Sequence, residues 1–327
     1  MSPQFFSDEE DPSPKETKPR ADHTRKAAPR RGRELSAEEG NATVLELYPN
    51  QCAVRRDGVP GRSLHPYRMS TLAFDGKDRE RSPVCVGDRV RIEVNAVVGR
   101  CVRRNRLVRS APNSRDPLLH VIAANIDCLV AVAAAHDPEF SPGIVDRFLV
   151  AATSQGIAPV LCVNKTDLHA PGAAKPWGYY RTAGITVLET SARSSAGIPE
   201  LHAFIRGRVT AFCGHSGVGK TSLLRRLLGD ENYGRVGEMS AATGMGRHTT
   251  TSAVLLPGPE DSTWIDTPGI MNFTLVGVDK SGLLILFPEL AAAALNCPAG
   301  CAHADEPACA LRGLPRFPSY RQIGNSL

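Results

Sequence analysis

Two short stretches decide the fold of this chain: Asn164-Lys165-Thr166-Asp167 and, later in the sequence, Gly214-His215-Ser216-Gly217-Val218-Gly219-Lys220-Thr221. The second reads G-x-x-x-x-G-K-T, follows the apolar run Val209 to Cys213 and precedes a helical pattern from Thr221 to Leu228. A strand, a glycine-rich loop and a helix in this succession are the context of a phosphate-binding loop. We therefore expect an open α/β sheet that carries ligand motifs at the carboxyl ends of its strands.

The glycines of this loop let backbone N–H groups turn toward a β-phosphate. Lys220 would neutralise β- and γ-phosphate oxygens, and the Thr221 hydroxyl would bind the Mg²⁺ that accompanies the nucleotide. A chance glycine-rich turn is the alternative, and the flanking strand and helix argue against it. The predicted phosphate contacts are Gly214, His215, Ser216, Gly217, Val218, Gly219, Lys220, Thr221 and Ser222.

The earlier stretch has the chemistry to select a base. The Asp167 carboxylate can accept hydrogen bonds from N1–H and the 2-amino group of guanine, whereas adenine offers neither donor there. Lys165 can lie along the base plane, and Ser191-Ala192 resembles the loop that gives a backbone N–H to guanine O6. The predicted base contacts are Asn164, Lys165, Thr166, Asp167, Ser191 and Ala192.

A third motif, Asp266-Thr267-Pro268-Gly269, follows the strand pattern Ser262 to Ile265. The Asp266 carboxylate can hold Mg²⁺ through water, and the Gly269 N–H can reach a γ-phosphate and sense the nucleotide state. Ile270 stands where Ras-like GTPases place a glutamine that orients water, so we expect slow intrinsic hydrolysis.

The order of the motifs is rotated, because in Ras-like GTPases the phosphate loop precedes the base motif. The sequence therefore predicts a circularly permuted G domain. We expect Val121 to Ala135 to form one continuous buried parallel strand. A helix is predicted over Pro142 to Gln155, and the strand Val160 to Val163 would deliver Asn164 at its end.

The glycine-containing linker Gly229 to Thr251 ends in Gly246-Arg247-His248-Thr249-Thr250-Thr251 and resembles a switch segment. One of its threonines would bind Mg²⁺, and we favour Thr250 over Thr249. His248 could orient or polarise water, although a single histidine in a loop is more often a bystander.

Before the α/β region, Thr43 to Leu47, Cys52 to Arg55 and Asp88 to Val94 alternate as short strands between glycines. They suit a small β-barrel such as an OB-fold, and an SH3-like barrel is the alternative. Residues 44–115 contain 15 Lys and Arg against 7 Asp and Glu, in a chain of net charge +5. This basic excess agrees about equally well with two interpretations: binding of a polyanion such as RNA, and a solvated Arg-rich face without a partner. The candidate phosphate partners are Arg89, Arg91, Arg100, Arg103, Arg104, Arg106 and Arg109.

Near the C-terminus, Cys297, Cys301, His303 and Cys309 supply three thiolates and an imidazole within a short segment. This is the full ligand set of a structural tetrahedral Zn²⁺ site, and chance clustering is the alternative. The chain has nine Cys, an odd number, which favours a reducing compartment. It shows no apolar leader, and its longest apolar run is too short to span a bilayer, so we expect a soluble cytoplasmic protein without membrane contact.

Together these residues resemble the RsgA (YjeQ) family of circularly permuted GTPases. The resemblance rests on the order NKTD, GHSGVGKTS, GRHTTT and DTPG, on Phe287-Pro288-Glu289 before the Cys/His cluster, and on the sequence from His303 to Cys309. Three features depart from the pattern: the first two zinc ligands are close together, Ile270 to Phe273 is unusual, and the terminal helix looks short.

Residues 1–41 are rich in Pro, Ser, Glu, Lys and Arg and poor in aliphatic side chains, so we expect a charged disordered tail there. The resemblance implies an RNA-binding OB-fold over 42–116. A circularly permuted Ras-like P-loop GTPase domain would cover 117–277, and a small zinc-binding domain 278–327. It also implies a monomer whose GTP hydrolysis is stimulated by the small (30S) ribosomal subunit, through rRNA binding, late in that subunit's maturation. His248, Lys220 and Thr250 would be catalytic.

Two other functions remain open. The chain could be a nucleotide-gated RNA-binding checkpoint protein whose hydrolysis is incidental. It could also be a permuted GTPase for the large subunit or an organelle, although the barrel and the Cys/His cluster argue against this.

Overall fold

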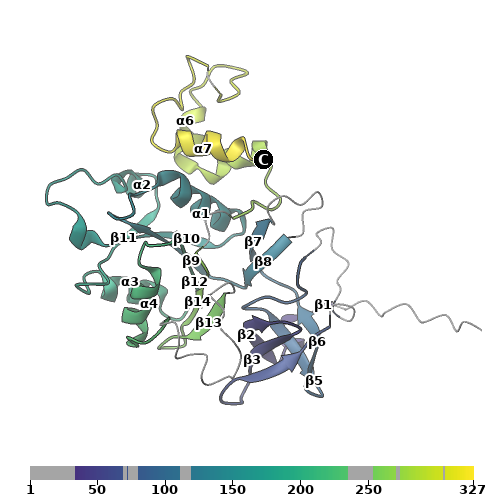
Figure 1. Cartoon of the computed structure of the whole chain (residues 1–327). Coiled ribbons are helices and arrows are strands. Elements are labelled where there is room, and N and C mark those ends of the chain that lie inside the picture. Colours follow the sequence, from purple (N-terminus) through teal and green to yellow (C-terminus); the bar gives the residue numbers. More distant parts are fainter. Residues whose placement is uncertain are drawn as a thin grey trace, which may run out of the picture.

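The computed structural model describes residues 34–68, 72, 80–110, 119–234, 253–269, 273–304 and 306–327. A small all-β part lies at one end of the molecule, an α/β part in the middle, and a helical C-terminal part at the other end (Figure 1). None of the helices in the described part of the chain has the length and apolar character needed to span a lipid bilayer.

The middle part is built on parallel strands in the order β14-β12-β9-β10-β11. Their bounds are β9 Cys128–Ala134, β10 Ala158–Asn164, β11 Thr186–Glu189, β12 Val209–Gly214 and β14 Thr263–Asp266. The strand β13, Val254–Pro257, pairs antiparallel with β14. Because neighbouring parallel strands end at the same edge of a sheet, Asn164, Gly214 and Asp266 come to one edge.

Helices cover both faces of this sheet because successive strand residues point to opposite sides. One face packs on α1 (Pro142–Ser154) and α2 (Gly178–Thr182), where Leu129, Ala131 and Ala133 of β9 are buried. The other packs on α3 (Ile198–Ile205) and α4 (Lys220–Leu228), against the alternate β9 residues. The predicted helices and strands around the motifs are thereby confirmed.

The prediction of one strand from Val121 to Ala135 is wrong. The run forms two strands, β8 (Leu119–Ala124) and β9, and β8 pairs antiparallel with β7 (Arg106–Ser110) in a separate sheet. The chain turns at Asn125, which has φ of 59° and donates from Nδ2 to the Gly87 carbonyl at 2.9 Å. Asparagine tolerates this left-handed backbone better than most residues, which explains the break at this position.

The all-β part comprises β2 (Ala42–Tyr48), β3 (Gln51–Arg56), β4 (Ser63–Pro66), β5 (Arg89–Glu93) and β6 (Ala96–Cys101). The strand β2 pairs antiparallel with both β3 and β5, β3 with β4, and β5 with β6. A short strand β1 (Glu34–Leu35) runs parallel to β6, followed by the 3-10 turn η1 (Ala37–Glu39). The inward side chains form an apolar core that includes Val44, Val54 and Val90.

The first and middle parts share one sheet, since Val254 of β13 pairs with Glu46 of β2. The strand β2 has an irregular register between Val44 and Glu46, and the intervening Leu45 packs against the core of the middle part. The strand β2 is therefore joined to the α/β part by both backbone pairing and apolar contact.

The C-terminal part contains α5 (Lys280–Leu283), the 3-10 turn η3 (Leu284–Leu286), α6 (Pro288–Ala294) and α7 (Phe317–Gly324). It packs around Phe287, Leu290 and Leu311, and Val150 of α1 joins this core. The buried Arg316 donates to Asp146 of α1 at 2.6 Å and to both Glu289 carboxylate oxygens at 3.0 and 3.1 Å. An apolar core and a buried charge cluster thus hold this part on α1.

Candidate functional site

The predicted phosphate loop connects β12 to α4 at the common edge of the strands. Gly219 has φ of 88°, and a Cβ atom there would lie 2.3 Å from Asn164 Nδ2. Only glycine fits this close approach, so the loop passes directly against the predicted base motif. The N-terminus of α4 follows, where backbone N–H groups and the helix dipole favour an anion.

Asn164 joins the three segments of the site. It is 1 % exposed, its Nδ2 donates to the Val218 carbonyl at 3.0 Å, and its Oδ1 accepts from the Ala192 N–H at 3.1 Å. Lys165, in a left-handed conformation, donates from Nζ to the backbone carbonyl of Asp137. These bonds fix the loop 214–220 beside the loop that contains Ser191 and Ala192.

Asp167 lies in the 3-10 turn η2 (Thr166–Leu168) directly after β10. Its Oδ1 accepts a hydrogen bond from the Ser191 hydroxyl at 2.6 Å, while the Ser191 oxygen accepts from the Ser194 N–H at 3.1 Å. Thr166 donates from both N and Oγ1 to the Thr190 carbonyl. The hydrogen bond from Ser191 directs Oδ1 of this exposed carboxylate toward the loop 191–194.

A cavity of about 340 Å³ opens beside these residues. Its lining includes Asn164, Lys165, Asp167, Ala192, Gly219 and Ser222, together with Leu168, Arg193, Arg225, Arg226 and Glu231. A volume near the lower end of the ~300–1,000 Å³ range for small-molecule pockets suits a planar base with part of its sugar. The sequence motifs do not predict the five lining residues Leu168, Arg193, Arg225, Arg226 and Glu231, because none of them belongs to a motif.

Asp266 ends β14 near the phosphate loop and is 6 % exposed. Lys220 donates from Nζ to Asp266 Oδ1, and Tyr233 donates from its hydroxyl to Oδ2 at 2.6 Å. Burial and the nearby Asp266 raise the pKa of Tyr233, so the phenol keeps the proton that it donates. Gly269 lies close to Ser216 of the phosphate loop. No motif in the sequence singles out Tyr233.

Several predicted residues cannot be placed. His248, Thr249 and Thr250, with the rest of Gly246 to Thr251, lie outside the described residues, and so does Ile270. Their roles remain predictions.

The Cys/His cluster is assembled in the C-terminal part. The ligand atoms of Cys297, Cys301, His303 and Cys309 all lie within 4.8 Å of one another. His303 Nδ1 is 3.5–3.7 Å from the three sulfurs, and the sulfurs of Cys297 and Cys309 are 3.9 Å apart. Tetrahedral Zn²⁺ with ordinary bond lengths would give N–S and S–S edges of ~3.6 Å and ~3.8 Å.

The loop between these ligands is also braced. Glu306 accepts hydrogen bonds from the N–H groups of Ala302 and Ala304, both at 2.8 Å, on either side of His303. His303 itself has φ of 55°. A carboxylate that fixes the backbone around a ligand is a common support of a metal site. The donor atoms and their arrangement therefore fit zinc.

The other cysteines have a structural role. All nine are free thiols, and six of them are buried singly outside the cluster. Burial raises the pKa of Cys162 and of Cys213 to about 12, which keeps both thiols protonated near neutral pH. They are not nucleophiles, because reactivity requires the thiolate.

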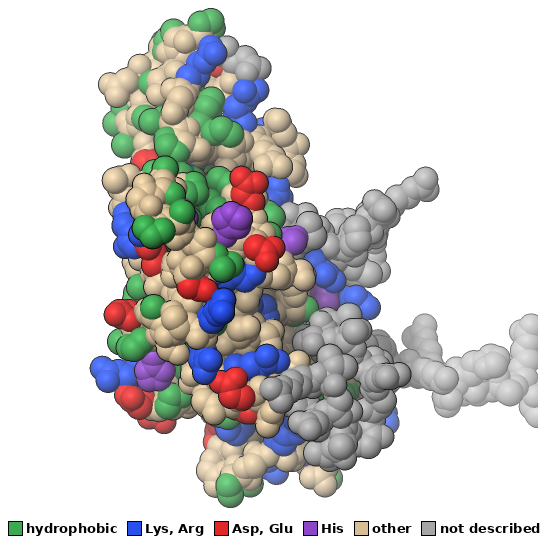
Figure 2. All heavy atoms as spheres, turned by 60° about the vertical axis from the view of Figure 1, so that its left-hand side comes forward, with side chains coloured by type: hydrophobic (Ala, Val, Ile, Leu, Met, Phe, Trp, Pro, Cys, Tyr) green, Lys and Arg blue, Asp and Glu red, His purple; other side chains and the backbone are tan. Residues whose placement is uncertain are grey.

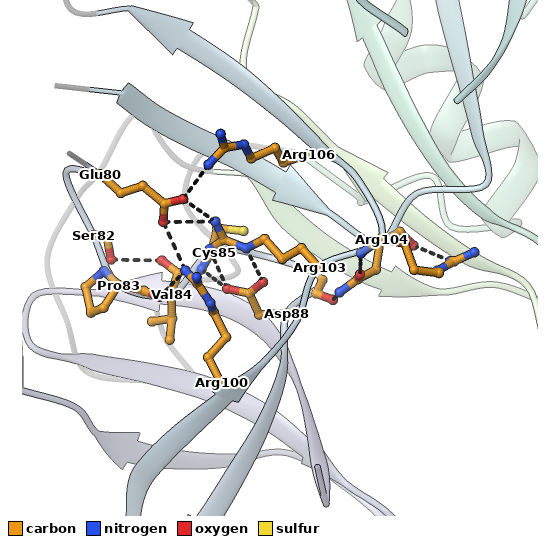
Figure 3. Close-up of polar contacts among 12 residues, drawn as sticks. Glu80, Ser82, Pro83, Val84, Cys85, Asp88, Arg100, Arg103, Arg104 and Arg106 are labelled. Atoms are coloured by element: carbon orange, nitrogen blue, oxygen red, sulfur yellow. Dashed lines mark hydrogen bonds and ion pairs between the residues drawn. The ribbon is translucent and has the colours of Figure 1, made fainter. Parts of the chain in front are cut away.

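The prediction that Arg100 and Arg103 contact phosphates is wrong. Their side chains are 5 % and 6 % exposed, and both donate to Glu80 at 2.9–3.0 Å. Arg103 also forms a two-point ion pair with the buried Asp88 at 2.6 and 2.8 Å, as Figure 3 shows. Their positive charges are paired with carboxylates inside the protein and are not presented to a phosphate at the surface. The reason is that the fold places the Glu80 and Asp88 carboxylates within hydrogen-bonding distance of Arg103.

The other candidate arginines are closer to the surface. Arg89 pairs with Asp57, Arg91 with Glu93, Arg104 with Asp127 and Arg106 with Glu80. Surface pairs of this kind contribute only ~0–1 kcal/mol, so a phosphate can replace the carboxylate partner where the arginine is exposed. Figure 2 shows basic and acidic side chains interspersed over the face it presents, without one uniform basic field.

Comparisons with known proteins agree with this geometry. The family model described as RsgA GTPase matches residues 100–276. A relative from Chlorobaculum tepidum, named small ribosomal subunit biogenesis GTPase RsgA, is 39% identical over 212 residues, which is 64% of this chain and 67% of the relative. A Pseudomonas aeruginosa protein of the same name is 39% identical over 243 residues, 70% of each chain.

Two solved structures have the same fold. YjeQ from Thermotoga maritima matches with a TM-score of 0.62 at 24% identity, over 88% of this chain and 98% of that one. YloQ, described as a circularly permuted GTPase, matches with a TM-score of 0.58 at 21% identity, over 88% and 94%. The rotated motif order, the single edge that gathers the motifs and these matches lead to one conclusion: the chain belongs to the RsgA GTPase family.

Proposed function

We propose that this GTPase assists late maturation of the small (30S) ribosomal subunit, and that the subunit stimulates its GTP hydrolysis by binding through rRNA. The observation that carries the proposal is the preset Asp167 carboxylate, which Ser191 holds at 2.6 Å beside a cavity that continues to the phosphate loop. The names of the Chlorobaculum and Pseudomonas relatives support the ribosomal role.

In the proposed site, guanine lies against Asp167, with Asn164, Lys165, Thr166, Ser191 and Ala192 around it. The phosphates lie on the loop Gly214 to Ser222, where Lys220 exchanges Asp266 for β- and γ-phosphate oxygens. This exchange is favourable because a phosphate carries more negative charge than the carboxylate it replaces. The Gly269 N–H is the proposed contact of the γ-phosphate, and GDP would lack it.

Mg²⁺ is the proposed cofactor of the nucleotide, and the donors available for it fit. The Thr221 hydroxyl and the Asp266 carboxylate are the hard oxygen ligands that Mg²⁺ prefers. When bound, the ion neutralises charge on the phosphates. Thr250 as a further ligand and His248 as the group that orients the attacking water are proposals that rest on the family resemblance.

We also propose the domain division 42–116, 117–277 and 278–327, preceded by a charged tail over 1–41. It is supported by three apolar clusters, each drawn mostly from one of these ranges: one around Val44, one around β9 and one around Phe287. The pairing of β2 with β3 and β5, and of β5 with β6, is the pattern of an OB-fold barrel and supports that assignment over an SH3-like barrel. Zn²⁺ is proposed as a structural ion in the last domain.

We propose an rRNA surface on exposed arginines of the barrel region, among them Arg55, Arg62, Arg81 and Arg104. Contacts between these side chains and phosphates would position the protein without reading sequence, and binding would weaken steeply with salt. We place the monomeric protein in the cytoplasm, where its ribosomal partner is assembled.

The test is steady-state GTP hydrolysis with purified small subunits, large subunits or neither. Strong stimulation by small subunits alone is the expected result, and His248→Ala should abolish it while nucleotide binding persists. Equal stimulation by large subunits would refute the 30S assignment. Nucleotide-dependent binding to small subunits without stimulation would instead favour the checkpoint function.

A further inference from the structure

Tyr233 occupies a fixed position between α4 and the edge of the sheet. It is 9 % exposed, and its ring belongs to the same apolar cluster as Leu224 and Trp264. Its carbonyl accepts from Arg225 Nε at 2.7 Å, and its N–H donates to the Asp230 carbonyl at 3.3 Å. The ring is therefore placed by the core and by α4, independently of any contact that its hydroxyl makes.

The hydroxyl of this ring reaches one oxygen of the carboxylate predicted to face the metal. Tyr233 donates to Asp266 Oδ2 at 2.6 Å, while Lys220 donates to Oδ1. The two oxygens consequently have different partners. One partner is a rigid phenol from the core, and the other is a flexible ammonium group whose proposed destination is the nucleotide phosphates.

The next residue touches the other predicted metal ligand. Gly234 has φ of 72°, and a Cβ atom there would lie 2.6 Å from Thr221 Cγ2. Two consecutive residues thus lie against Asp266 and Thr221. This arrangement can hold both oxygen donors in a constant relation while the nucleotide is exchanged.

We propose that Tyr233 is a positioning residue for the magnesium site: its hydroxyl holds Asp266 Oδ2 so that Oδ1 alone is released when Lys220 moves to the phosphates. The proposal rests on the magnesium site of the proposed function and adds a residue to it. Without the hydroxyl, the carboxylate can rotate and follow Lys220, and the metal loses an oriented partner. Outer contacts of this type typically change metal affinity by ~10–100-fold.

The experiment compares the wild-type protein with Tyr233→Phe, which keeps the ring in the core and removes only the hydroxyl. Release of a fluorescent GDP analogue is followed by stopped flow over a Mg²⁺ titration and in EDTA. Tyr67→Phe is the control, because Tyr67 follows β4 in the all-β part and, among the described residues, its hydroxyl makes a single contact, at 3.5 Å, with the Tyr48 carbonyl.

We expect Tyr233→Phe to raise the Mg²⁺ concentration for half-maximal nucleotide retention by about tenfold, the lower end of the range for outer contacts. In EDTA the variant and the wild type should release the analogue at the same rate. An unchanged Mg²⁺ dependence would overturn the proposal. A lower half-maximal concentration would also overturn it, because the hydroxyl would then compete with the ion.

Equally faster release with and without Mg²⁺ would show that Tyr233 only supports packing, which contradicts the proposal as well. If the wild-type protein itself retained the analogue equally well with Mg²⁺ and with EDTA, the magnesium site would be wrong and the role of Tyr233 with it. That result is separate from a failure of the variant alone.

Discussion

Replacing Arg316 by methionine should loosen the C-terminal part far more at neutral than at acid pH. Arg316 is 2 % exposed, and Asp146 is completely buried. Arg316 makes a 2.6 Å bond to Asp146 and also lies 4.5 Å from the centre of the Phe287 ring. Methionine keeps much of the apolar contact and removes the charge, so Asp146 and Glu289 both lose their cation, and Asp146 is the one that is completely buried.

The magnitude follows from the carboxyl group. Burial raises the pKa of Asp146, and Arg316 opposes this effect. Without Arg316, the folded protein would have to hold Asp146 protonated. From an unfolded pKa of ~3.9 and ~1.36 kcal/mol per unit, neutralisation costs about 4 kcal/mol at pH 7 and about 2 kcal/mol at pH 5.5. The first value agrees with the ~3–5 kcal/mol known for breaking a buried pair.

The pH dependence of this cost follows from proton linkage. A carboxyl whose folded pKa is raised is protonated in both states below the unfolded pKa, so its penalty vanishes there. The penalty grows as pH rises from the unfolded toward the folded pKa. The difference between variant and wild type must therefore shrink when the pH is lowered from 7 to 5.5.

Native-state hydrogen exchange of the α7 amides, with Zn²⁺ present, measures the effect. At pH 7 we expect Arg316→Met to exchange about 1,000-fold faster, which corresponds to about 4 kcal/mol. Arg312→Met, which changes an exposed arginine of the same part, should stay within ~0.5 kcal/mol of wild type. Arg316→Met/Asp146→Leu should be more protected than Arg316→Met alone.

The reasoning would be refuted by a cost under about 1 kcal/mol, by an equal cost at both pH values, or by a double variant less protected than the single one.

Three further changes test other parts of the molecule. Asp167→Asn should weaken GTP binding by at least about 100-fold and improve binding of xanthosine triphosphate, since Asn can donate to the 2-oxo group; unchanged guanine preference in nucleotide titrations would contradict this. In Cys301→Ser, elemental analysis should find no bound zinc and the α7 amides should lose their protection from hydrogen exchange, while nucleotide affinity is retained. A full equivalent of zinc in the variant would exclude Cys301 as a ligand. Glu80→Gln should lower the urea unfolding free energy of the barrel by about 2–3 kcal/mol, since Arg100 and Arg103 lose a shared counter-charge, and an unchanged midpoint would show that the cluster contributes nothing.

Much of the middle part could be predicted because its motif residues are close in sequence to the strands that position them. Asn164, Gly214 and Asp266 each follow an apolar run, and a parallel sheet brings the ends of such runs together. The break between β8 and β9 was missed although Asn125 and Asp127 interrupt the run. Periodicity alone could not show that Asn125 turns the chain.

Contacts between distant residues could not be predicted. Composition counts Arg100 and Arg103 as basic, but only the fold brings Glu80 between them. Arg316 and Asp146 are separated by most of the middle and C-terminal sequence, and neither belongs to a motif. The position of Tyr233 depends on the cluster around Trp264, whose members come from several strands and helices far apart in the sequence.

The pairing of β13 with β2 bears on how the chain can be divided. β13 is the outermost strand of the α/β part, and in the intact protein β2 covers its edge at Val254 while Leu45 covers apolar surface behind it. A fragment truncated at the barrel boundary would carry that edge uncovered. Uncovered strand edges recruit other strands and cause aggregation. The all-β part therefore covers, at Val254, a strand edge through which the α/β part could otherwise pair with other chains.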